Sequence, residues 1–196
     1  FARTGKMFAI EHWGVEPDAL ISAKPIASGL PMGVLVSRGE LMEAWSPPAH
    51  LFTTEANPVA CAAAMATLDV IEREGLPERA ARLGGRVMKR FEEMEGGFDL
   101  IGDVRGKGLL IGVELVEDRK TKEPARAKAL KVCWRAWERG LVMISFGRCG
   151  NVLRIAPPLT IGEEELETAL GIIEASIKDV VEGKVPDSVL QGMSAW

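Results

Sequence analysis

The sequence predicts a mixed α/β fold in two parts, an incomplete α/β part over residues 1–75 and an α+β part over residues 76–196. In the first part, short apolar runs alternate with loops rich in proline and glycine and lead into one long helix. In the second part, the patterns follow the order α-β-β-α-β-β-α, which favours helices packed on one face of a sheet. We expect the boundary near Gly75, where the composition has become charged.

Composition narrows the classes of protein to which the chain can belong. Of its 196 residues 47% are hydrophobic and 27% charged, which excludes a disordered chain, and no apolar run approaches the roughly 18 residues that a membrane span needs. The net charge of −4 offers no basic surface for nucleic acid. Three cysteines without close pairs, and two isolated histidines, His12 and His50, suggest neither a disulfide framework nor a metal site. These features fit a reducing cytoplasm.

The opening of the chain predicts that it begins inside a larger protein. Phe1 is not a start methionine, and the next residues contain neither the apolar core of a signal peptide nor the arginine-rich pattern of a transit peptide. We therefore expect part of any functional site to lie upstream of residue 1.

The first part is expected to contain two strands and two helices. The apolar run 18–24 is typical of a buried strand in a parallel sheet, with Lys24 at its end and a shaped loop after it. A second strand follows over 34–36, and a capping box formed by Ser37 and Glu40 predicts a short helix. Asn57 and Pro58 suit the cap and first position of a long helix, whose small apolar residues we expect to be buried all round.

The second part is expected to alternate helices and strands around one sheet. The predicted helices cover residues 77–94 and 123–140, and a third helix follows a capping box of Thr160 and Glu163 and runs to about residue 183. The predicted strands cover residues 100–104, 109–116, 141–146 and 152–156. The glycines at 106, 108 and 112 lack the G-x-G-x-x-G spacing of a dinucleotide fold.

Two candidate functional positions lie in the first part. A lysine at the end of an apolar strand is partly desolvated and can attack a carbonyl, although most lysines in such loops are solvated surface groups, so Lys24 has two interpretations. Thr53 and Thr54 precede a helix N-terminus, where free N–H groups and the helix dipole favour an anion such as phosphate. The alternative for these threonines is ordinary capping.

Arg154 is the third candidate. It stands inside the apolar strand pattern 152–156, where a guanidinium is costly unless it meets a carboxylate. That carboxylate belongs either to a substrate or to an acidic side chain of the protein, and the residues alone leave both open.

Several of these segments resemble the C-terminal half of class III aminotransferases, the ornithine and 4-aminobutyrate type. The matching stretches are GKMFAIEHWGVEPDALISAKPIASGLPMG, TTEANPVACAAA, GDVRGKGLLIGVEL and LRIAPPLT, in the family's order. The resemblance implies a pyridoxal 5′-phosphate (PLP) enzyme of fold type I, with the second half of the large domain followed by a small domain. It also implies amino-acid and 2-oxo-acid substrates and a homodimer with shared active sites.

The resemblance assigns a role to each candidate. Lys24 would form the Schiff base with the cofactor, Thr53 would reach the cofactor phosphate of the neighbouring subunit, and Arg154 would hold the substrate carboxylate. The family's pyridine-binding aspartate, ring-stacking aromatic residue and own-subunit phosphate loop would precede residue 1. Two departures, Pro25–Pro31 in place of a glycine-rich stretch and Glu55-Ala56 in place of two glycines, could alter the mouth of the pocket.

The leading hypothesis is therefore an aminotransferase that moves an amino group from an amino acid or ω-amino acid to an oxo acid such as 2-oxoglutarate. Amino-acid racemases and dialkylglycine decarboxylase resemble the same segments, so racemisation and decarboxylation are alternatives. A third hypothesis is that the chain alone is a non-catalytic folding or dimerisation fragment.

Overall fold

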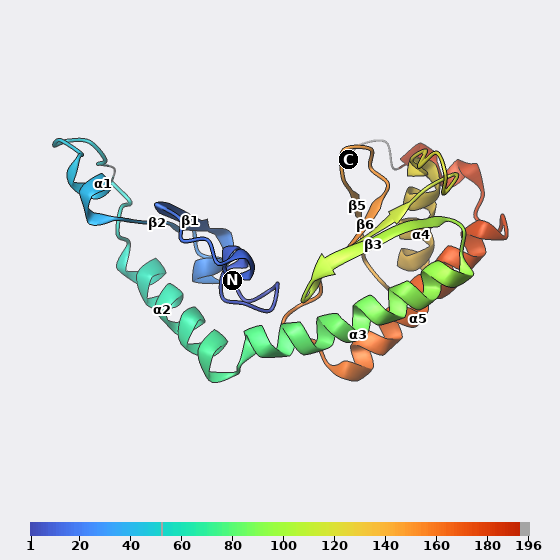
Figure 1. The fold of residues 1–196 in the computed structure, drawn as a ribbon, viewed down its shortest axis with the longest axis horizontal. Helices are drawn as coiled ribbons and strands as arrows, with labels where there is room; N and C mark the ends of the chain where they lie inside the picture. Colours follow the sequence, from blue (N-terminus) through green and yellow to red (C-terminus); the bar gives the residue numbers. More distant parts are fainter. Residues whose placement is uncertain (52, 193–196) are drawn as a thin grey trace.

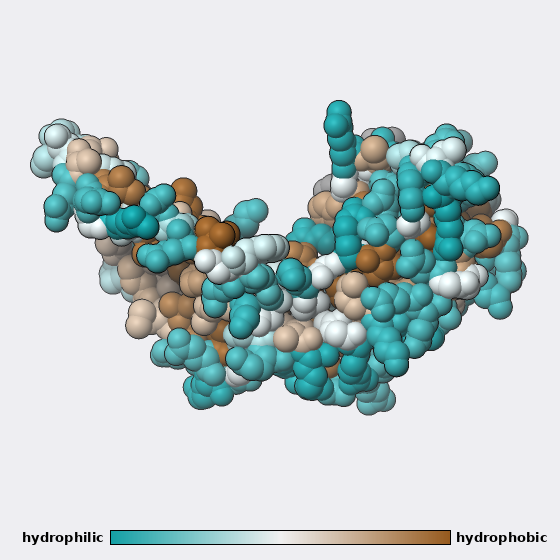
Figure 2. Space-filling view, in the orientation of Figure 1, coloured by the Kyte–Doolittle hydropathy of each residue, from teal (hydrophilic) through white to brown (hydrophobic). Residues whose placement is uncertain are grey.

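A computed structural model describes residues 1–51 and 53–192, the last of these by its backbone alone. The chain forms two lobes that diverge from the junction of α2 (Pro58–Arg73) and α3 (Leu76–Gly97), and the N-terminus lies on the inner side of the first lobe (Figure 1). We call residues 1–75 the N-terminal lobe and residues 76–192 the C-terminal lobe. The space-filling view is hollowed between the lobes (Figure 2).

The N-terminal lobe is built on a β-hairpin and one long helix. Its strands β1 (Ala19–Ala23) and β2 (Gly33–Ser37) pair antiparallel, with Ile21 opposite Leu35. The other elements of this lobe are η1 (Ala9–Trp13), η2 (Lys24–Ala27), α1 (Gly39–Glu43) and α2 (Pro58–Arg73). Ile26 and Ala27 of η2 pack against Ala64 of α2, which joins the helix to the hairpin.

The strand predicted over 18–24 is present, but the expectation that it is buried in a parallel sheet is wrong for this structure. β1 pairs only with β2, and no other strand of the described ranges lies beside it. Ile21 is 81% exposed and Val36 59% exposed. Figure 2 accordingly shows hydrophobic residues at the surface of this lobe.

Two local expectations for this lobe also need correction. Ser37 and Glu40 do not form a capping box, because Arg38 is the N-cap of α1 and the Ser37 hydroxyl donates instead to the Asp18 carbonyl at 2.9 Å. The helix α2 is not buried all round. Only Ala60, Ala64 and Ile71 of this helix are buried, whereas its other faces lack a covering layer and leave residues such as Val59 exposed.

The C-terminal lobe contains the four-stranded sheet and three helices that its sequence predicts. Its elements follow the expected order: α3 (Leu76–Gly97), β3 (Ile101–Lys107), β4 (Leu110–Leu115), α4 (Arg126–Glu138), β5 (Ser145–Phe146), β6 (Val152–Ile155) and α5 (Glu163–Val181), with η3 (Asp187–Gly192) last. The strand order is β3-β4-β6-β5, and every pair is antiparallel. The predicted α+β pattern is thus confirmed for this lobe.

Three element ends differ from expectation for identifiable reasons. The helix α4 begins at Arg126 because Pro124 is used in a β-bridge with Val116. The strand expected over 141–146 is reduced to β5, two residues at the edge of the sheet. The α5 cap is Gly162, whose N–H donates to the Glu165 carboxylate, so Thr160 and Glu163 do not form the expected box.

The sheet has one buried face and one open face. Ile111, Val113 and Leu115 of β4 are fully buried and belong to the same core cluster as residues of all three helices. Their neighbours Gly112 and Glu114 point the other way, because side chains alternate along a strand. The register places Gly112 opposite Arg154, so Arg154 shares the open face.

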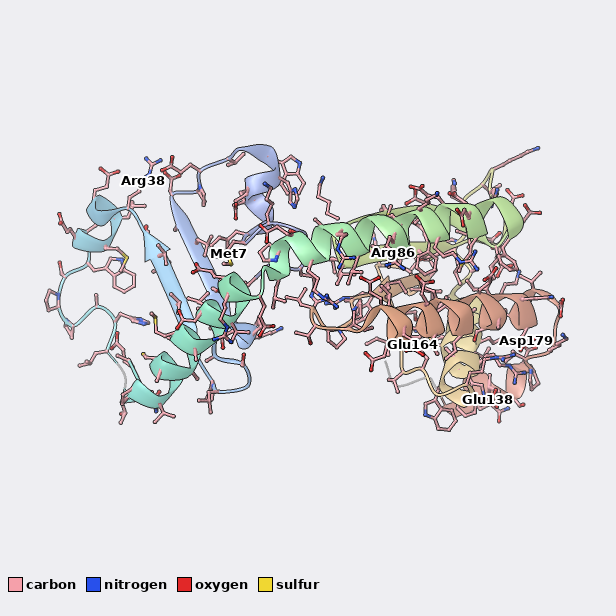
Figure 3. The ribbon with its side chains drawn as sticks, turned by 90° about the horizontal axis from the view of Figure 1, so that it is seen from below. Met7, Arg38, Arg86, Glu138, Glu164 and Asp179 are labelled. Atoms are coloured by element: carbon pink, nitrogen blue, oxygen red, sulfur yellow. The ribbon has the colours of Figure 1, made fainter. Side chains whose placement is uncertain are left out.

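The helices α3 and α5 lie side by side under the sheet and are joined by ion pairs (Figure 3). Arg86 contacts both Glu163 at 2.5 Å and Glu167 at 2.7 Å, and Arg82 also reaches Glu163 at 2.8 Å. Arg90 pairs with Glu174 further along. Hydrogen bonds from Arg82 and Arg86 hold the pKa of the Glu163 carboxyl below its ordinary value.

Glycines allow the two lobes to touch. Gly108, at the turn between β3 and β4, has a positive φ of 52°, and a Cβ there would lie 2.6 Å from the carbonyl oxygen of Arg3. On its other side, a Cβ at Gly84 of α3 would overlap the Gly108 carbonyl. A Cβ at Gly5 would come within 2.9 Å of Ala81 Cβ. The N-terminal segment, the turn and α3 therefore approach each other at backbone distance.

No helix within the described ranges is both long enough and apolar enough to cross a bilayer.

We predict that G84A lowers the free energy of unfolding by about 1–3 kcal/mol, because the added methyl group overpacks a contact with main-chain atoms. The matched control is G85A, where a Cβ would meet no atom within 4 Å. The free energy of unfolding of G85A is expected to rise by about 0.5–1 kcal/mol, since alanine has a higher helix propensity than glycine. Denaturant unfolding of the two variants measures the difference. Equal effects would contradict the close approach at Gly84.

We also predict that E163Q removes part of the acid sensitivity of the fold. The pKa of Glu163 is lower in the folded chain than in the unfolded chain. Its stabilising contribution is therefore present above the unfolded pKa, about 4.3, and is lost as the pH falls through the folded pKa. Thermal unfolding between neutral pH and pH values below that range should show a smaller decrease in E163Q than in the parent chain.

Glu164 provides the control for this measurement, because its carboxylate forms no ion pair with another residue of the described ranges. E164Q should keep the acid sensitivity of the parent. An E164Q curve as flat as that of E163Q would contradict the role of the α3–α5 ion pairs.

Candidate functional site

Lys24 stands at the point where β1 ends and η2 begins. Its φ of 52° lies in the left-handed region, and this conformation turns the chain sharply out of the strand. The side chain is exposed and makes no hydrogen bond or ion pair with any residue that the structure describes. The partial desolvation expected for Lys24 is therefore not provided by this chain, but its amine is accessible.

Thr53 lies in the exposed turn that leads to α2, and the anion site expected at this helix N-terminus is not left open. Asn57 accepts hydrogen bonds from the N–H groups of Val59 and Ala60 at 3.0 and 3.2 Å, and Pro58 has no N–H. The Asn57 cap is confirmed, and it occupies the donors that an anion would need. Any phosphate bound by Thr53 or Thr54 would thus be held by groups of the turn and not by the N–H groups of α2.

Arg154 projects from β6 on the open face of the sheet. The guanidinium lies over the Phe146 ring, 5.0 Å from its centroid, and is exposed. Within the described ranges no carboxylate pairs with it, so the structure does not contain the internal ion pair that was the alternative for this residue. An arginine with an aromatic platform and no acidic partner can bind a carboxylate from outside.

Arg3, which sequence reasoning did not select, contacts the segment that follows Arg154. Its guanidinium Nη1 donates to the carbonyl oxygens of Pro157 at 2.6 Å and Leu109 at 3.2 Å. Burial, and then the positive charge of Arg154, hold the pKa of Arg3 below its ordinary value. No motif in the sequence signals this neighbourhood, because Arg3 reaches Pro157 and Leu109 only through the packing of the two lobes.

An apolar pocket of about 410 Å³ lies beside Arg154. The segment before β5 forms one wall, the helix α5 another, and Arg154 contributes the charged group; the lining includes Leu141, Met143, Phe146, Ala156, Leu166 and Leu170. Val142 and Ile144 on the same edge segment are 81% and 53% exposed. Charge and apolar surface thus occur together at this edge of the sheet.

The three residues selected from the sequence are not in mutual contact. No hydrogen bond or ion pair among the described residues joins Lys24, Thr53 and Arg154 to one another. Lys24 and Thr53 belong to the N-terminal lobe, whereas Arg154 is in β6 of the other lobe (Figure 1). The structure therefore does not bring the three candidates together, and their placement within one active centre stays a prediction.

Comparison with known proteins decides the family. Residues 1–177 match the family described as Aminotransferase class-III. The chain belongs to this family. The resemblance found in the sequence is confirmed, and the class III aminotransferases are a PLP-dependent family.

Relatives in this family differ in the reaction for which they are named. The chain is 52% identical to a leucine/methionine racemase of Thermococcus litoralis, over 99% of the chain and 43% of the racemase. It is 47% identical to an alanine/serine racemase of Pyrococcus horikoshii, over 96% of the chain and 39% of that protein. A 4-aminobutyrate aminotransferase of Mycobacterium bovis is 43% identical over 92% of the chain and 40% of the enzyme.

A solved structure agrees with this assignment. An amine transaminase from an uncultivated Pseudomonas species, in its PLP-bound form, has a TM-score of 0.83 at 31% identity and is matched over 91% of this chain and 42% of the transaminase. The chain thus spans about two-fifths of the length of these relatives.

The described residues contain no group of three His, Cys, Asp or Glu side chains that could hold a metal ion. The three cysteines are free thiols, and burial raises the pKa of Cys133 to about 12.

We predict that N57A destabilises the fold by about 1 kcal/mol, because two N–H groups of α2 lose their acceptor. N57D keeps a side-chain oxygen at the same position and should retain most of the stability. Denaturant unfolding measures both variants. If N57A and N57D were equally destabilised, the cap would not be the reason.

Proposed function

We propose that the whole protein is a PLP-dependent enzyme that acts at the α-carbon of amino acids, with racemisation or epimerisation as its reaction. The observation that carries the proposal is Arg154, an exposed arginine over an aromatic ring with no acidic partner among the described residues. Such a group suits the carboxylate that every amino-acid substrate carries.

The residues of this chain fit the cofactor. Lys24 has an accessible amine, no competing partner among the described side chains, and a position at the end of a strand. It would hold PLP covalently through Nζ and, when released by the substrate amine, would accept or return a proton at the substrate α-carbon. PLP, when bound, supplies the electron sink that makes this proton acidic.

Arg154 and Thr53 would position the reactants. By fixing the substrate carboxylate with two parallel N–H donors, Arg154 would orient the α-carbon toward the lysine. Thr53, in an exposed turn, would offer its hydroxyl to the cofactor phosphate of a second subunit. This arrangement requires a homodimer with shared sites, which we propose for the whole protein.

The choice of reaction rests on the relatives. The two proteins named as racemases are 52% and 47% identical to the chain, whereas the 4-aminobutyrate aminotransferase is 43% identical. Transamination to an oxo acid such as 2-oxoglutarate is the second candidate. It is supported by the family itself and by the amine transaminase structure.

The same proposal covers the arrangement of the chain. Residues 1–75 would belong to a large cofactor-binding domain and residues 76–196 to a small domain. The exposed apolar side chains of the hairpin and α2, including Ile21 at 81% and Val59 at 66%, would be covered within the large domain or by the second subunit. Three free thiols are compatible with a reducing, cytoplasmic location.

We expect the whole protein, loaded with PLP, to interconvert L- and D-forms of an amino acid without any oxo acid. In D₂O the α-hydrogen should exchange, because the proton removed by Lys24 equilibrates with solvent. Chiral chromatography and NMR measure the two events. Strict dependence on an added oxo acid would identify transamination instead, and release of carbon dioxide would identify decarboxylation.

K24A is the control, and it should lose both conversion and exchange while keeping its fold by circular dichroism. Borohydride reduction followed by peptide mapping should place the cofactor label on Lys24. A label on another lysine, or turnover by K24A, would refute the assignment.

A further inference from the structure

The segment that follows β6 is held by side chains from two other elements. Pro157 and Pro158 have no N–H group, so this segment cannot continue the hydrogen-bond ladder of the sheet. Arg79 of α3 binds the far end of this segment, because its guanidinium donates to the carbonyl oxygens of Leu159 at 3.1 Å and Ile161 at 2.5 Å. The near end, three residues after Arg154, depends on a different arginine.

Arg3 holds this near end and links it to the β3–β4 turn. Its guanidinium donates to the carbonyl oxygens of Pro157 and Leu109, and its own carbonyl oxygen accepts a hydrogen bond from the Leu109 N–H at 2.8 Å. Hydrogen bonds from a charged donor are stronger than neutral ones. The end of β6 is therefore tied to the N-terminal segment, which belongs to the lobe that carries Lys24.

Arg3 and Arg154 both contribute positive charge to the region at the end of β6. Arg3 donates to the carbonyl oxygen of Pro157, three residues after Arg154. Burial, and then the positive charge of Arg154, lower the pKa of Arg3. Neither guanidinium pairs with a carboxylate of the described residues. Two neighbouring positive charges without a counter-ion attract an anion more strongly than either does alone.

We infer that Arg3 is a positioning residue for the substrate carboxylate. Its hydrogen bonds to Pro157 and Leu109 tie the segment that follows Arg154 to the β3–β4 turn, and its charge strengthens the attraction of Arg154 for the carboxylate. The inference rests on the proposed function, since it assigns a substrate carboxylate to Arg154. It adds a residue from the N-terminal lobe to the recognition of that group.

The test compares two trapping reagents that react with PLP held by the whole protein. Aminooxyacetate carries a carboxylate, whereas O-methylhydroxylamine carries none, and the loss of the cofactor band at visible wavelengths gives both rates. We expect R3Q to lower the ratio of the two rates about tenfold, because a charge and two hydrogen bonds are lost near the carboxylate. The rate with O-methylhydroxylamine should stay within about twofold, since it does not use Arg154.

Two further variants separate positioning from general stability. R3K keeps the charge but cannot reach both carbonyls in the same way, so its ratio should lie between those of R3Q and the parent. R79Q is the matched control, because Arg79 binds the far end of the same segment. It should lower the unfolding midpoint and leave the ratio of trapping rates unchanged.

Hydrogen exchange supplies a readout that does not depend on reactivity. In R3Q, peptides covering residues 151–156 should exchange faster than in the parent, because the end of β6 loses its anchor. In R79Q the increase should be confined to residues 159–161.

A ratio that falls in R3Q and not in R79Q would support the inference. Equal falls in both variants, or an equal loss of both trapping rates in R3Q, would overturn it by reducing Arg3 to a structural role. If R3Q did not fold, R3K would take its place: a ratio of trapping rates that falls in R3K and not in R79Q would support the inference, and equal ratios in R3K and the parent would overturn it. A parent protein without a cofactor band would overturn the proposed function and the inference together, whereas a normal band with unchanged ratios would overturn the inference alone.

Discussion

The contact on which the arrangement of this chain depends is the backbone approach of the N-terminal segment, the β3–β4 turn and α3. Gly108 lies between the main chain of residues 3–5 and Gly84, and side chains at these glycines would overlap main-chain atoms. Packing at this distance lets the Leu109 N–H reach the Arg3 carbonyl. The same approach brings the Arg3 side chain to Pro157, so the orientation of the lobes and the surroundings of Arg154 have one physical origin.

The sheet of the C-terminal lobe separates the residues of the core from the arginine that we propose for substrate recognition. Its buried face, with Ile111, Val113 and Leu115, joins the three helices in one core. Its open face carries charged groups, of which Arg105 is paired with Asp103 and Glu114 whereas Arg154 has no carboxylate among the described residues. A strand can present both functions because its side chains alternate. Arg154 is thereby held by a rigid element and stays accessible.

The N-terminal lobe has the opposite character. Its hairpin has no further strand beside it in the described ranges, and residues such as Ile21 and Val36 stay exposed. Apolar surface of this kind marks a contact with other parts of a protein or with a partner. The chain spans about two-fifths of the length of its relatives. The exposed apolar side chains Ile21 and Val36 belong to the lobe that carries Lys24.

The sequence by itself determined the family, the order of elements and the cap of α2. Amphipathic periodicity defined α3 and α5, and Asn57-Pro58 defined a helix start, because these signals are local and their partners lie within a few residues. The expectation for Ser37 was wrong because its hydroxyl donates to the Asp18 carbonyl. The expectation for Thr160 was wrong because α5 begins later, with Gly162 as the cap and Glu165 as its acceptor. Burial of the strand before Lys24 was also wrong, since burial depends on neighbours outside the strand.

Only the tertiary structure decided how charges meet. Among the described residues it left Arg154 without an internal carboxylate, and it brought Arg3 from the other lobe to Pro157, three residues after Arg154. Electrostatic partners are chosen by distance in space, and no periodicity along the chain encodes that distance.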